Sequence, residues 1–357
     1  MKHELSDKEM ETYSRQIVLK DIGYEGQLKI RNGSVCIVGL GGLGCPLATQ
    51  LTAIGVGHLR IVDRDVIEHS NLHRQHLYDV SSLGHPKVEV AARKLNELNP
   101  DVEIEPVPLS LNVDNAELII KDVDVVADGL DRIEPRYAVN RACIKLGIPY
   151  VFGAAIESSG NASTIVPKET PCLECFYPNL RDELLPTCGM VGVHPSLLGI
   201  VSSLEASEVV RILMGEKPRL ANKLLYCDLR NLQFDEINIS RREDCPICGI
   251  NAREPPSSLK RKLIQEICGR GGKRTFVVTP RENLNISIED LTKYLSEKHF
   301  PIKVKANLGV TFNYMKTTAS ILKSGVMVVE GAEDQEQTSR IYREIVENLG
   351  IPWSRVE

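Results

Sequence analysis

The sequence predicts an α/β protein with a Rossmann-like, mostly parallel sheet covered by helices on both faces, plus a small C-terminal α+β domain. Short apolar runs alternate with amphipathic segments, and a glycine-rich turn joins the first of these runs to the next helix. Apolar strands separated by helices are typical of parallel sheets that are buried on both faces. The length of 357 residues exceeds one ordinary domain and favours two.

The predicted elements follow one another in the order that this fold requires. A capping box of Ser6 and Glu9 predicts an N-terminal helix, followed by the segment YSRQIVL. One apolar helical face groups Leu47, Leu51 and Ile54 after the glycine-rich turn. We expect the strands of the main sheet at residues 34–38, 58–62, 102–107, 123–127 and 148–154, and a long helix at Pro195–Met214.

The chain divides near residue 250. Residues 251–258, NAREPPSS, are polar and contain two prolines, which predicts a linker between domains 1–250 and 259–357. The tail carries its own pattern of strand, amphipathic helix and further strands, so we expect a small α+β domain.

Composition narrows the function classes. The chain is 42% hydrophobic and 25% charged, with a formal net charge of −5, which argues against a nucleic-acid partner. No apolar run reaches the roughly 18 residues of a membrane span, and the charged N-terminal segment does not resemble a signal peptide. We therefore expect a cytoplasmic protein without a membrane partner. Its ten cysteines should then be metal ligands, catalytic thiols or buried apolar residues.

The glycine-rich turn predicts a nucleotide site. Gly39, Gly41, Gly42 and Gly44 follow a predicted strand and open a helix, and Asp63 ends the next strand about 20 residues later. Glycines let the backbone approach a phosphate, and an acidic residue at this spacing can bind ribose hydroxyls. Taken alone, this pattern indicates only a nucleotide site, and a nicotinamide-dependent dehydrogenase would be the default interpretation.

Polar residues after the second strand favour ATP. Asn71, Arg74 and Gln75 lie in SNLHRQ, and Lys87 begins the next predicted helix in GHPK. Clustered cations suit a triphosphate and its departing pyrophosphate. Asp131 follows a later strand at the carboxyl edge of the sheet, where a carboxylate can hold Mg²⁺.

The motifs YSRQIVL, GLGGLG, IVDRD, SNLHRQ and GHPK, with two CxxC pairs, resemble the ThiF/MoeB/HesA adenylyltransferases. These are bacterial relatives of ubiquitin-activating enzymes, and the resemblance runs from about residue 4 to residue 250. It implies a homodimer that adenylates the C-terminal glycine of a ubiquitin-like or sulfur-carrier protein ending in Gly-Gly.

The resemblance also implies residue roles. Asp63 would bind ribose, and the phosphate contacts would come from Asn71, Arg74 and Lys87. Asp131 would organise Mg²⁺, and Arg15 resembles the arginine that reaches into the partner subunit's ATP site. Two departures from the family pattern are Thr12, where relatives often have arginine, and GLDR in place of CTDN around Asp131.

Two CxxC pairs, Cys172 with Cys175 and Cys245 with Cys248, lie about 70 residues apart. Two such turns can complete a closed tetrahedral Zn²⁺ site, which would be structural. A redox dithiol is the alternative.

Cys188 lies in TCGMVG, which resembles the family segment that carries the acceptor cysteine. In that role its thiolate would attack the acyl-adenylate and expel AMP; the alternative is a packed thiol. We expect Cys36, Cys45, Cys143 and Cys227 to be buried and inert, and Cys268 receives no role.

Three functions remain, in this order. The first is activation of a ubiquitin-like modifier, with Cys188 as acceptor. The element order of the C-terminal domain partly resembles the ubiquitin fold that recruits conjugating enzymes, and the alternative for this domain is a packing or dimer-stabilising role. The second is adenylation of a sulfur carrier for thiocarboxylate formation in molybdopterin, thiamine or tRNA thiolation. The third, a non-catalytic or dehydrogenase-like nucleotide binder, gives no role to Arg15, Arg74, Lys87 and Cys188. A fused rhodanese domain is excluded because no cysteine follows Cys268.

Overall fold

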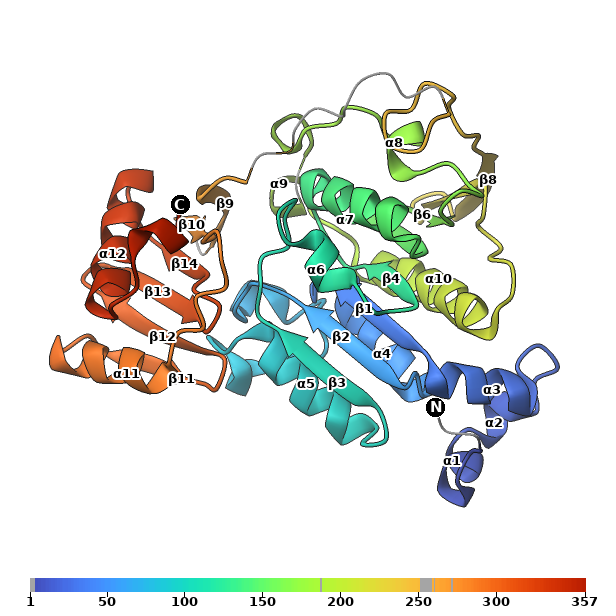
Figure 1. The fold of residues 1–357 in the computed structure, drawn as a ribbon, viewed down its shortest axis with the longest axis horizontal. Coiled ribbons are helices and arrows are strands. Elements are labelled where there is room, and N and C mark those ends of the chain that lie inside the picture. Colours follow the sequence, from blue (N-terminus) through green and yellow to red (C-terminus); the bar gives the residue numbers. More distant parts are fainter. Residues whose placement is uncertain (1–3, 187, 251–258, 260, 271) are drawn as a thin grey trace.

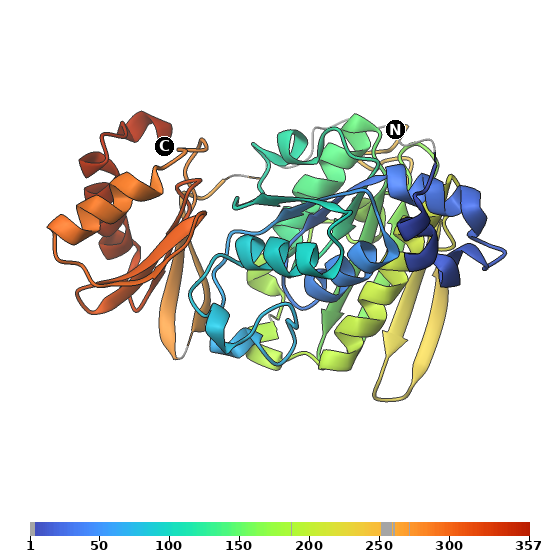
Figure 2. The same cartoon turned by 90° about the horizontal axis from the view of Figure 1, so that it is seen from below.

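The computed structural model describes residues 4–357 except 187, 251–258, 260 and 271. The predicted linker therefore lies outside the described residues. Two sheets lie side by side in Figures 1 and 2: an eight-stranded sheet with its helices, and a smaller six-stranded sheet formed by the C-terminal part of the chain.

The N-terminal segment folds into three short helices, α1 (Asp7–Thr12), α2 (Ser14–Ile17) and α3 (Gly23–Asn32). The predicted capping box is confirmed: Ser6 Oγ accepts the Glu9 N–H at 3.2 Å, and Glu9 Oε2 accepts the Ser6 N–H at 2.9 Å. Glu9 also pairs with Arg31 Nε at 2.5 Å, which ties α1 to α3.

The main sheet has the strand order β3-β2-β1-β4-β5-β6-β7-β8. Strands β1 to β5 pair in parallel with one another, whereas β6, β7 and β8 extend the sheet from β5 in antiparallel fashion. Its strands are β1 (Ser34–Val38), β2 (His58–Val62), β3 (Glu103–Val107), β4 (Val125–Asp128), β5 (Tyr150–Ile156), β6 (Ser159–Ile165), β7 (Lys223–Asp228) and β8 (Gln233–Asn238). The mostly parallel sheet is confirmed, and its antiparallel extension is a finding of the structure.

Helices cover both faces of this sheet. Strand β1 shows the alternation: Val35 and Ile37 join one apolar core, whereas Cys36 and Val38 join the other. The first core is covered by α4 (Gly44–Ile54), α5 (Lys87–Leu98) and α10 (Pro195–Met214), and the second by α6 (Ala116–Ile120), α7 (Ile133–Leu146) and α8 (Leu173–Phe176). One further helical turn, α9 (Cys188–Val191), precedes α10.

The C-terminal sheet has the order β11-β12-β13-β14-β10-β9, and all its pairings are antiparallel. Helices α11 (Ile288–Glu297) and α12 (Gln335–Asn348) pack on one face, where Phe276 and Phe312 are buried. Its strands are β9 (Ile264–Arg270), β10 (Lys273–Val278), β11 (Ile302–Lys305), β12 (Gly309–Tyr314), β13 (Thr317–Leu322) and β14 (Met327–Glu330). An α+β domain is confirmed, but the purely antiparallel sheet differs from the mixed sheet of a ubiquitin fold.

Candidate functional site

The glycine-rich turn between β1 and α4 packs against the turn that follows β4. Gly39 has a φ of +94°, and a Cβ there would lie 2.5 Å from the Gly129 carbonyl oxygen. A Cβ at Gly44 would lie 1.9 Å from the Gly39 carbonyl oxygen, so both glycines are required by the turn itself. A Cβ at Gly41 would meet nothing closer than 3.9 Å, where its neighbours are Gln75 Nε2 and the Gly129 oxygen. This side of the turn is the one that a phosphate can approach.

Asp63 holds the glycine-rich turn from the end of β2. Its carboxylate accepts the N–H groups of Leu40 and Asp65, both at 2.7 Å. Burial raises the pKa of Asp63, and the nearby Lys87 ammonium opposes that rise. Each carboxylate oxygen retains a lone pair, so ribose hydroxyls can still donate to Asp63. Gly42 faces away from this side, against the side chain of Leu198.

The structure brings Asn71, Gln75 and Lys87 into the same buried region, with exposed fractions of 6%, 3% and 5%. Asn71 Oδ1 accepts the Glu68 N–H at 3.1 Å, and Lys87 Nζ pairs with Asp65 Oδ2 at 3.3 Å. Arg74, in the same turn as Asn71, is half-buried and donates from Nη1 to the Ser70 carbonyl oxygen at 2.5 Å.

Gln75 has a buried polar atom that a ligand could satisfy. Among the described residues, its Oε1 atom is buried without a hydrogen-bond partner. An unsatisfied buried polar atom costs free energy of about 1–3 kcal/mol. A bound nucleotide can supply the missing partner, because a rotated amide presents its NH₂ group to a phosphate oxygen as readily as its oxygen to a hydroxyl.

The turn after β4 separates two carboxylates with different surroundings. Asp128 is fully buried and accepts hydrogen bonds from Arg136 Nε at 2.9 Å and the Tyr150 hydroxyl at 2.5 Å. Burial raises the pKa of Asp128, opposed by Arg136. Asp131 is exposed at the carboxyl edge of the sheet, beyond the Gly129 that touches the glycine-rich turn. An exposed carboxylate there suits Mg²⁺, which keeps much of its hydration shell.

Sequence reasoning missed how the turn after β4 is fixed. Asp128 Oδ1 accepts the Leu130 N–H at 2.8 Å, and Arg136 Nη2 donates to the Leu130 carbonyl oxygen at 2.6 Å. An aspartate eight residues before an arginine carries no recognisable signal, because a turn and the start of a helix separate them.

Arg15 is not brought to the glycine-rich turn within one chain. Its helix packs where α4 ends: Gln16 Nε2 donates to the Ile54 carbonyl oxygen at 3.1 Å, and the Tyr13 hydroxyl accepts from Asn99 Nδ2 at 2.8 Å. The glycine-rich turn lies at the start of α4. Because α4 has eleven residues, its two ends are about 16 Å apart. Arg15 is exposed, so a role at the nucleotide site requires a second copy of the chain.

The two CxxC pairs form one cluster. The Sγ atoms of Cys172, Cys175, Cys245 and Cys248 all lie within 4.8 Å of one another, and all four side chains are buried. The separations are 3.6 Å for Cys172–Cys245, 3.4 Å for Cys175–Cys248 and 4.0 Å for Cys172–Cys175. A tetrahedral zinc–thiolate site places its sulfurs about 3.8 Å apart. The donor set therefore fits Zn²⁺, and the four thiols are free rather than disulfide-bonded.

Cys188 begins α9, and its side chain lies outside the described part of the structure, as does that of Cys268. Its predicted role stays a prediction. The burial of Cys36, Cys45, Cys143 and Cys227 is confirmed, and burial raises the pKa of Cys36 and Cys45 to about 12, which makes both thiols inert at neutral pH.

The C-terminal domain contacts the loop that leads to Lys87 and the first turns of α5. Glu89 accepts the N–H groups of Asn307 and Leu308 at 3.0 and 2.7 Å, and Thr311 Oγ1 donates to the Gly84 carbonyl oxygen at 2.7 Å. An apolar cluster continues this contact with Val66, Val277, Leu322, Val326 and Val328. No sequence motif marks these contacts, because two of the donors are backbone groups.

Within the described ranges, no helix combines the length and the apolar character needed to cross a membrane.

Curated relatives match most of the chain. It is 37% identical to "Adenylyltransferase and sulfurtransferase MOCS3" of Culex quinquefasciatus over 266 residues, 74% of this chain but only 60% of that protein. It is 38% identical to "SAMP-activating enzyme E1" of Haloferax volcanii, over 69% of this chain and 91% of the relative. The "Sulfur carrier protein adenylyltransferase" of Thermus thermophilus is also 38% identical, over 68% and 92%.

Solved structures support the fold. Escherichia coli MccB with succinimide superposes with a TM-score of 0.60 at 23% identity, covering 67% of this chain and 74% of that one. At this identity the likeness concerns the fold alone. The sequence profile of the ThiF family matches residues 13–247, more than half of the chain, and the chain therefore belongs to the ThiF family.

Proposed function

We propose that this chain uses ATP to adenylate the C-terminal glycine of a small sulfur-carrier protein. The observation that carries the proposal is the match over 92% of a relative named sulfur carrier protein adenylyltransferase. A glycine-rich turn with an open side, beside a buried lysine and an unsatisfied glutamine, supports ATP as the second substrate.

In this proposal the reaction begins with the carrier's carboxylate attacking the α-phosphorus of ATP. The bond to the β-phosphate oxygen breaks, and pyrophosphate leaves. The carboxylate is already ionised at neutral pH, so no general base is needed. The chain must instead neutralise the anions and hold the carrier's tail in line with the α-phosphate.

Each polar residue of the site then has a task. Asp63 binds the ribose, Gly41 lets the phosphates approach the backbone, and Gln75 donates its amide to them. The cationic groups of Arg74 and Lys87, with the Asn71 amide, stabilise the charge on the β- and γ-phosphates. Asp131 would hold Mg²⁺, which supplies further neutralisation of the phosphates when bound.

The proposal includes a homodimer, because Arg15 lies too far from the glycine-rich turn of its own chain to contact a nucleotide there. In such a dimer, Arg15 of one protomer would reach the nucleotide site of its partner and add a third cation. The four-cysteine cluster would hold a structural Zn²⁺ that ties residues 172–175 to residues 245–248.

A second candidate function is activation of a ubiquitin-like modifier. The match over 91% of a relative named SAMP-activating enzyme E1 favours it. Here the Cys188 thiolate attacks the carbonyl carbon of the acyl-adenylate, AMP leaves, and the modifier is held as a thioester. Only this second candidate function involves a conjugating enzyme, which the C-terminal domain would recruit.

One experiment tests adenylation and separates the two candidates. The protein is incubated with ATP, Mg²⁺ and small proteins ending in Gly-Gly, with and without sulfide, and the products are analysed by intact mass spectrometry and non-reducing gels. A carrier thiocarboxylate that depends on ATP and sulfide supports sulfur-carrier activation. A thiol-sensitive adduct, lost in Cys188→Ala, supports the modifier route. If neither product forms with any diglycine protein, adenylation of such proteins is wrong.

A further inference from the structure

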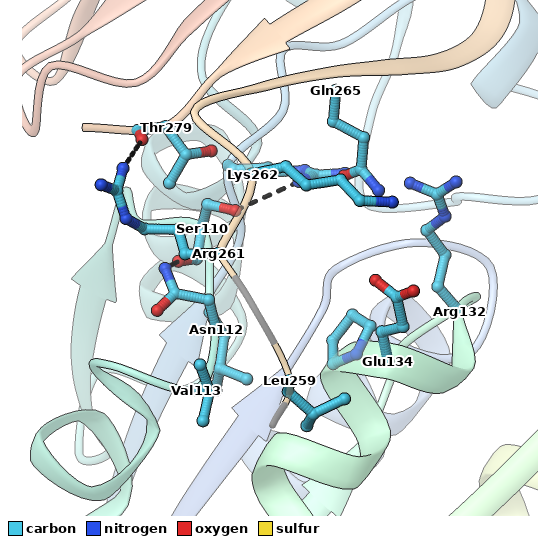
Figure 3. Close-up of a pocket in the computed structure, with 13 residues that line it drawn as sticks. Ser110, Asn112, Val113, Arg132, Glu134, Leu259, Arg261, Lys262, Gln265 and Thr279 are labelled. Atoms are coloured by element: carbon cyan, nitrogen blue, oxygen red, sulfur yellow. Dashed lines mark hydrogen bonds between the residues drawn. The ribbon is translucent and has the colours of Figure 1, made fainter. Parts of the chain in front are cut away.

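A hollow between the two sheets is lined by residues from both parts of the chain (Figure 3). Its space is about 600 Å³, counting the open mouth. The main-sheet wall includes Arg64, Ser110 and Arg132, and the C-terminal wall includes Arg261 and Lys262.

The main-sheet wall belongs to the carboxyl edge of the parallel sheet. Arg64 follows Asp63 directly, and Arg132 follows Asp131 directly. Ser110 comes shortly after β3, which is held beside β2 by the Asp63 N–H donating to the Val107 carbonyl oxygen at 3.2 Å. Ligands of open α/β sheets bind at this edge, so the hollow adjoins the nucleotide site.

Cationic groups dominate the lining. Arg64, Arg132, Arg261 and Lys262 line it, against one carboxylate, Glu134. Figure 3 shows Lys262 and Arg132 reaching toward the same part of the hollow from opposite walls, and their charges are close enough to interact. Burial raises the pKa of Glu134, and the nearby Lys262 and Arg132 oppose that rise.

Two guanidinium groups have capacity left for a ligand. Among the described residues, Arg64 donates a hydrogen bond to the Ser110 hydroxyl at 3.1 Å. Arg132 Nε pairs with Asp182 Oδ2 at 3.8 Å, and among the same residues its Nη1 atom is buried without a hydrogen-bond partner. Arg261 is different, because it donates to the Thr279 carbonyl oxygen at 2.7 Å and to the Glu357 backbone oxygen at 2.9 Å, and pairs with Asp114 at 3.5 Å.

Among the described residues, Lys262 is held by a surface ion pair. It pairs with Glu183 at 2.9 Å, and both side chains are more than half exposed. Such pairs contribute at most about 1 kcal/mol, so an anion entering the hollow can take Lys262 over. Converging guanidinium and ammonium groups recognise phosphate, through paired hydrogen bonds from arginine and a point charge from lysine.

We propose that this hollow is a phosphate-binding site shared by the main sheet and the C-terminal domain, in which Arg64, Arg132 and Lys262 bind a phosphate group of a small-molecule ligand. The phosphate comes either from the nucleotide bound beside it or from a free phosphate compound. In both cases the ligand bridges the two parts of the chain.

Isothermal titration calorimetry of the full chain tests this site without any carrier protein, so its result is independent of the proposed adenylation. The probes are inorganic pyrophosphate and a non-hydrolysable ATP analogue. Lys262→Glu reverses one charge of the hollow, and Arg64→Gln removes another. Lys303→Glu, an exposed residue of β11 outside the hollow, is the matched control. Thermal unfolding checks that each variant remains folded.

Two results support the site and identify the source of the phosphate. If the phosphate is free, pyrophosphate still binds a Lys87→Ala protein, and adding Lys262→Glu weakens that binding at least about tenfold. If the phosphate belongs to the nucleotide, pyrophosphate does not bind the Lys87→Ala protein. Lys262→Glu then weakens binding of the ATP analogue at least about tenfold, whereas Lys303→Glu changes that binding less than about twofold. If folded Lys262→Glu and Arg64→Gln variants bind both probes like the control, the inference is wrong.

Discussion

The glycine-rich edge of the main sheet and the four-cysteine cluster differ in how open they are to a ligand. In the cluster, four buried thiols face one another within 4.8 Å, so the donor set is complete without solvent or substrate. At the sheet edge, one side of Gly41 is open and Gln75 Oε1 has no partner among the described residues. In the proposed function, this difference separates a site for a permanent ion from a site for a substrate that binds and leaves.

The largest expected effect concerns the closed site. Cys245→Ser should remove bound zinc and lower the melting temperature by roughly 10 °C or more, because structural zinc contributes several kcal/mol to folding. Zinc content by mass spectrometry and thermal unfolding measure this. Cys143→Ala, another buried thiol, is the control: it should retain zinc and lose only about 1–2 kcal/mol of stability. Unchanged zinc content in Cys245→Ser would contradict the assignment.

The open site should respond in the opposite way, with activity lost and the fold retained. Lys87→Ala should lower carrier-dependent ATP–pyrophosphate exchange by about 100-fold or more, because a buried cation is removed from the phosphates. Lys94→Ala is the matched control on the same helix, where Lys94 forms a surface pair with Asp79 at 3.5 Å. Equal rates in the two variants would remove Lys87 from the site.

The contrast between these regions also explains what the sequence could predict. Strand β1 and helix α10 match their expected bounds. The side chains of β1 alternate between two cores, and α10 begins with Pro195 and ends before Gly215, which has a left-handed conformation. The cysteine cluster was predictable because CxxC spacing itself encodes two ligands of one ion.

Features that depend on tertiary packing were not predictable. Strand β8 is exposed along its whole length and lacks an alternating pattern, so the antiparallel extension had no sequence signal. The Asp128–Arg136–Tyr150 contacts and the Glu89 contacts with Asn307 and Leu308 join residues from separate elements. Local spacing carries no information about such pairs.

A smaller expected effect tests whether the open site is completed by a second copy. Arg15→Ala should lower exchange by roughly 10- to 100-fold while ATP-analogue binding by calorimetry changes little. Mixing Arg15→Ala with Lys87→Ala should restore part of the activity, because a mixed dimer contains one site with both cations. No restoration after subunit exchange, verified by tagged pull-down, would contradict a role in trans.

The smallest expected effect concerns Glu9, which lies outside both the glycine-rich edge and the cysteine cluster. It shows the size of a stability change that involves neither site. Burial acts to raise the pKa of Glu9, but the Ser6 N–H and the Arg31 guanidinium outweigh it and lower that pKa to about 2. The charged form is therefore favoured in the folded state, and its stabilisation is complete above the usual pKa of 4.5 and lost as the pH falls through about 2.

Glu9→Gln should accordingly reduce the free energy of unfolding by about 1 kcal/mol at pH 7, with a smaller difference below pH 4.5. Urea unfolding of both proteins at several pH values measures this. A difference that grows on acidification would show that the Glu9 carboxylate is not stabilised by its partners.

Carrier-dependent ATP–pyrophosphate exchange tests the central claim most directly. Each candidate small protein is compared with a version that lacks its last glycine, using wild-type protein and Cys188→Ala. Exchange should require the terminal glycine and persist in Cys188→Ala, because adenylation precedes any transfer to a cysteine. Exchange that is indifferent to the terminal glycine, or absent with every diglycine protein despite measurable ATP binding, would contradict adenylation of a carrier's C-terminus.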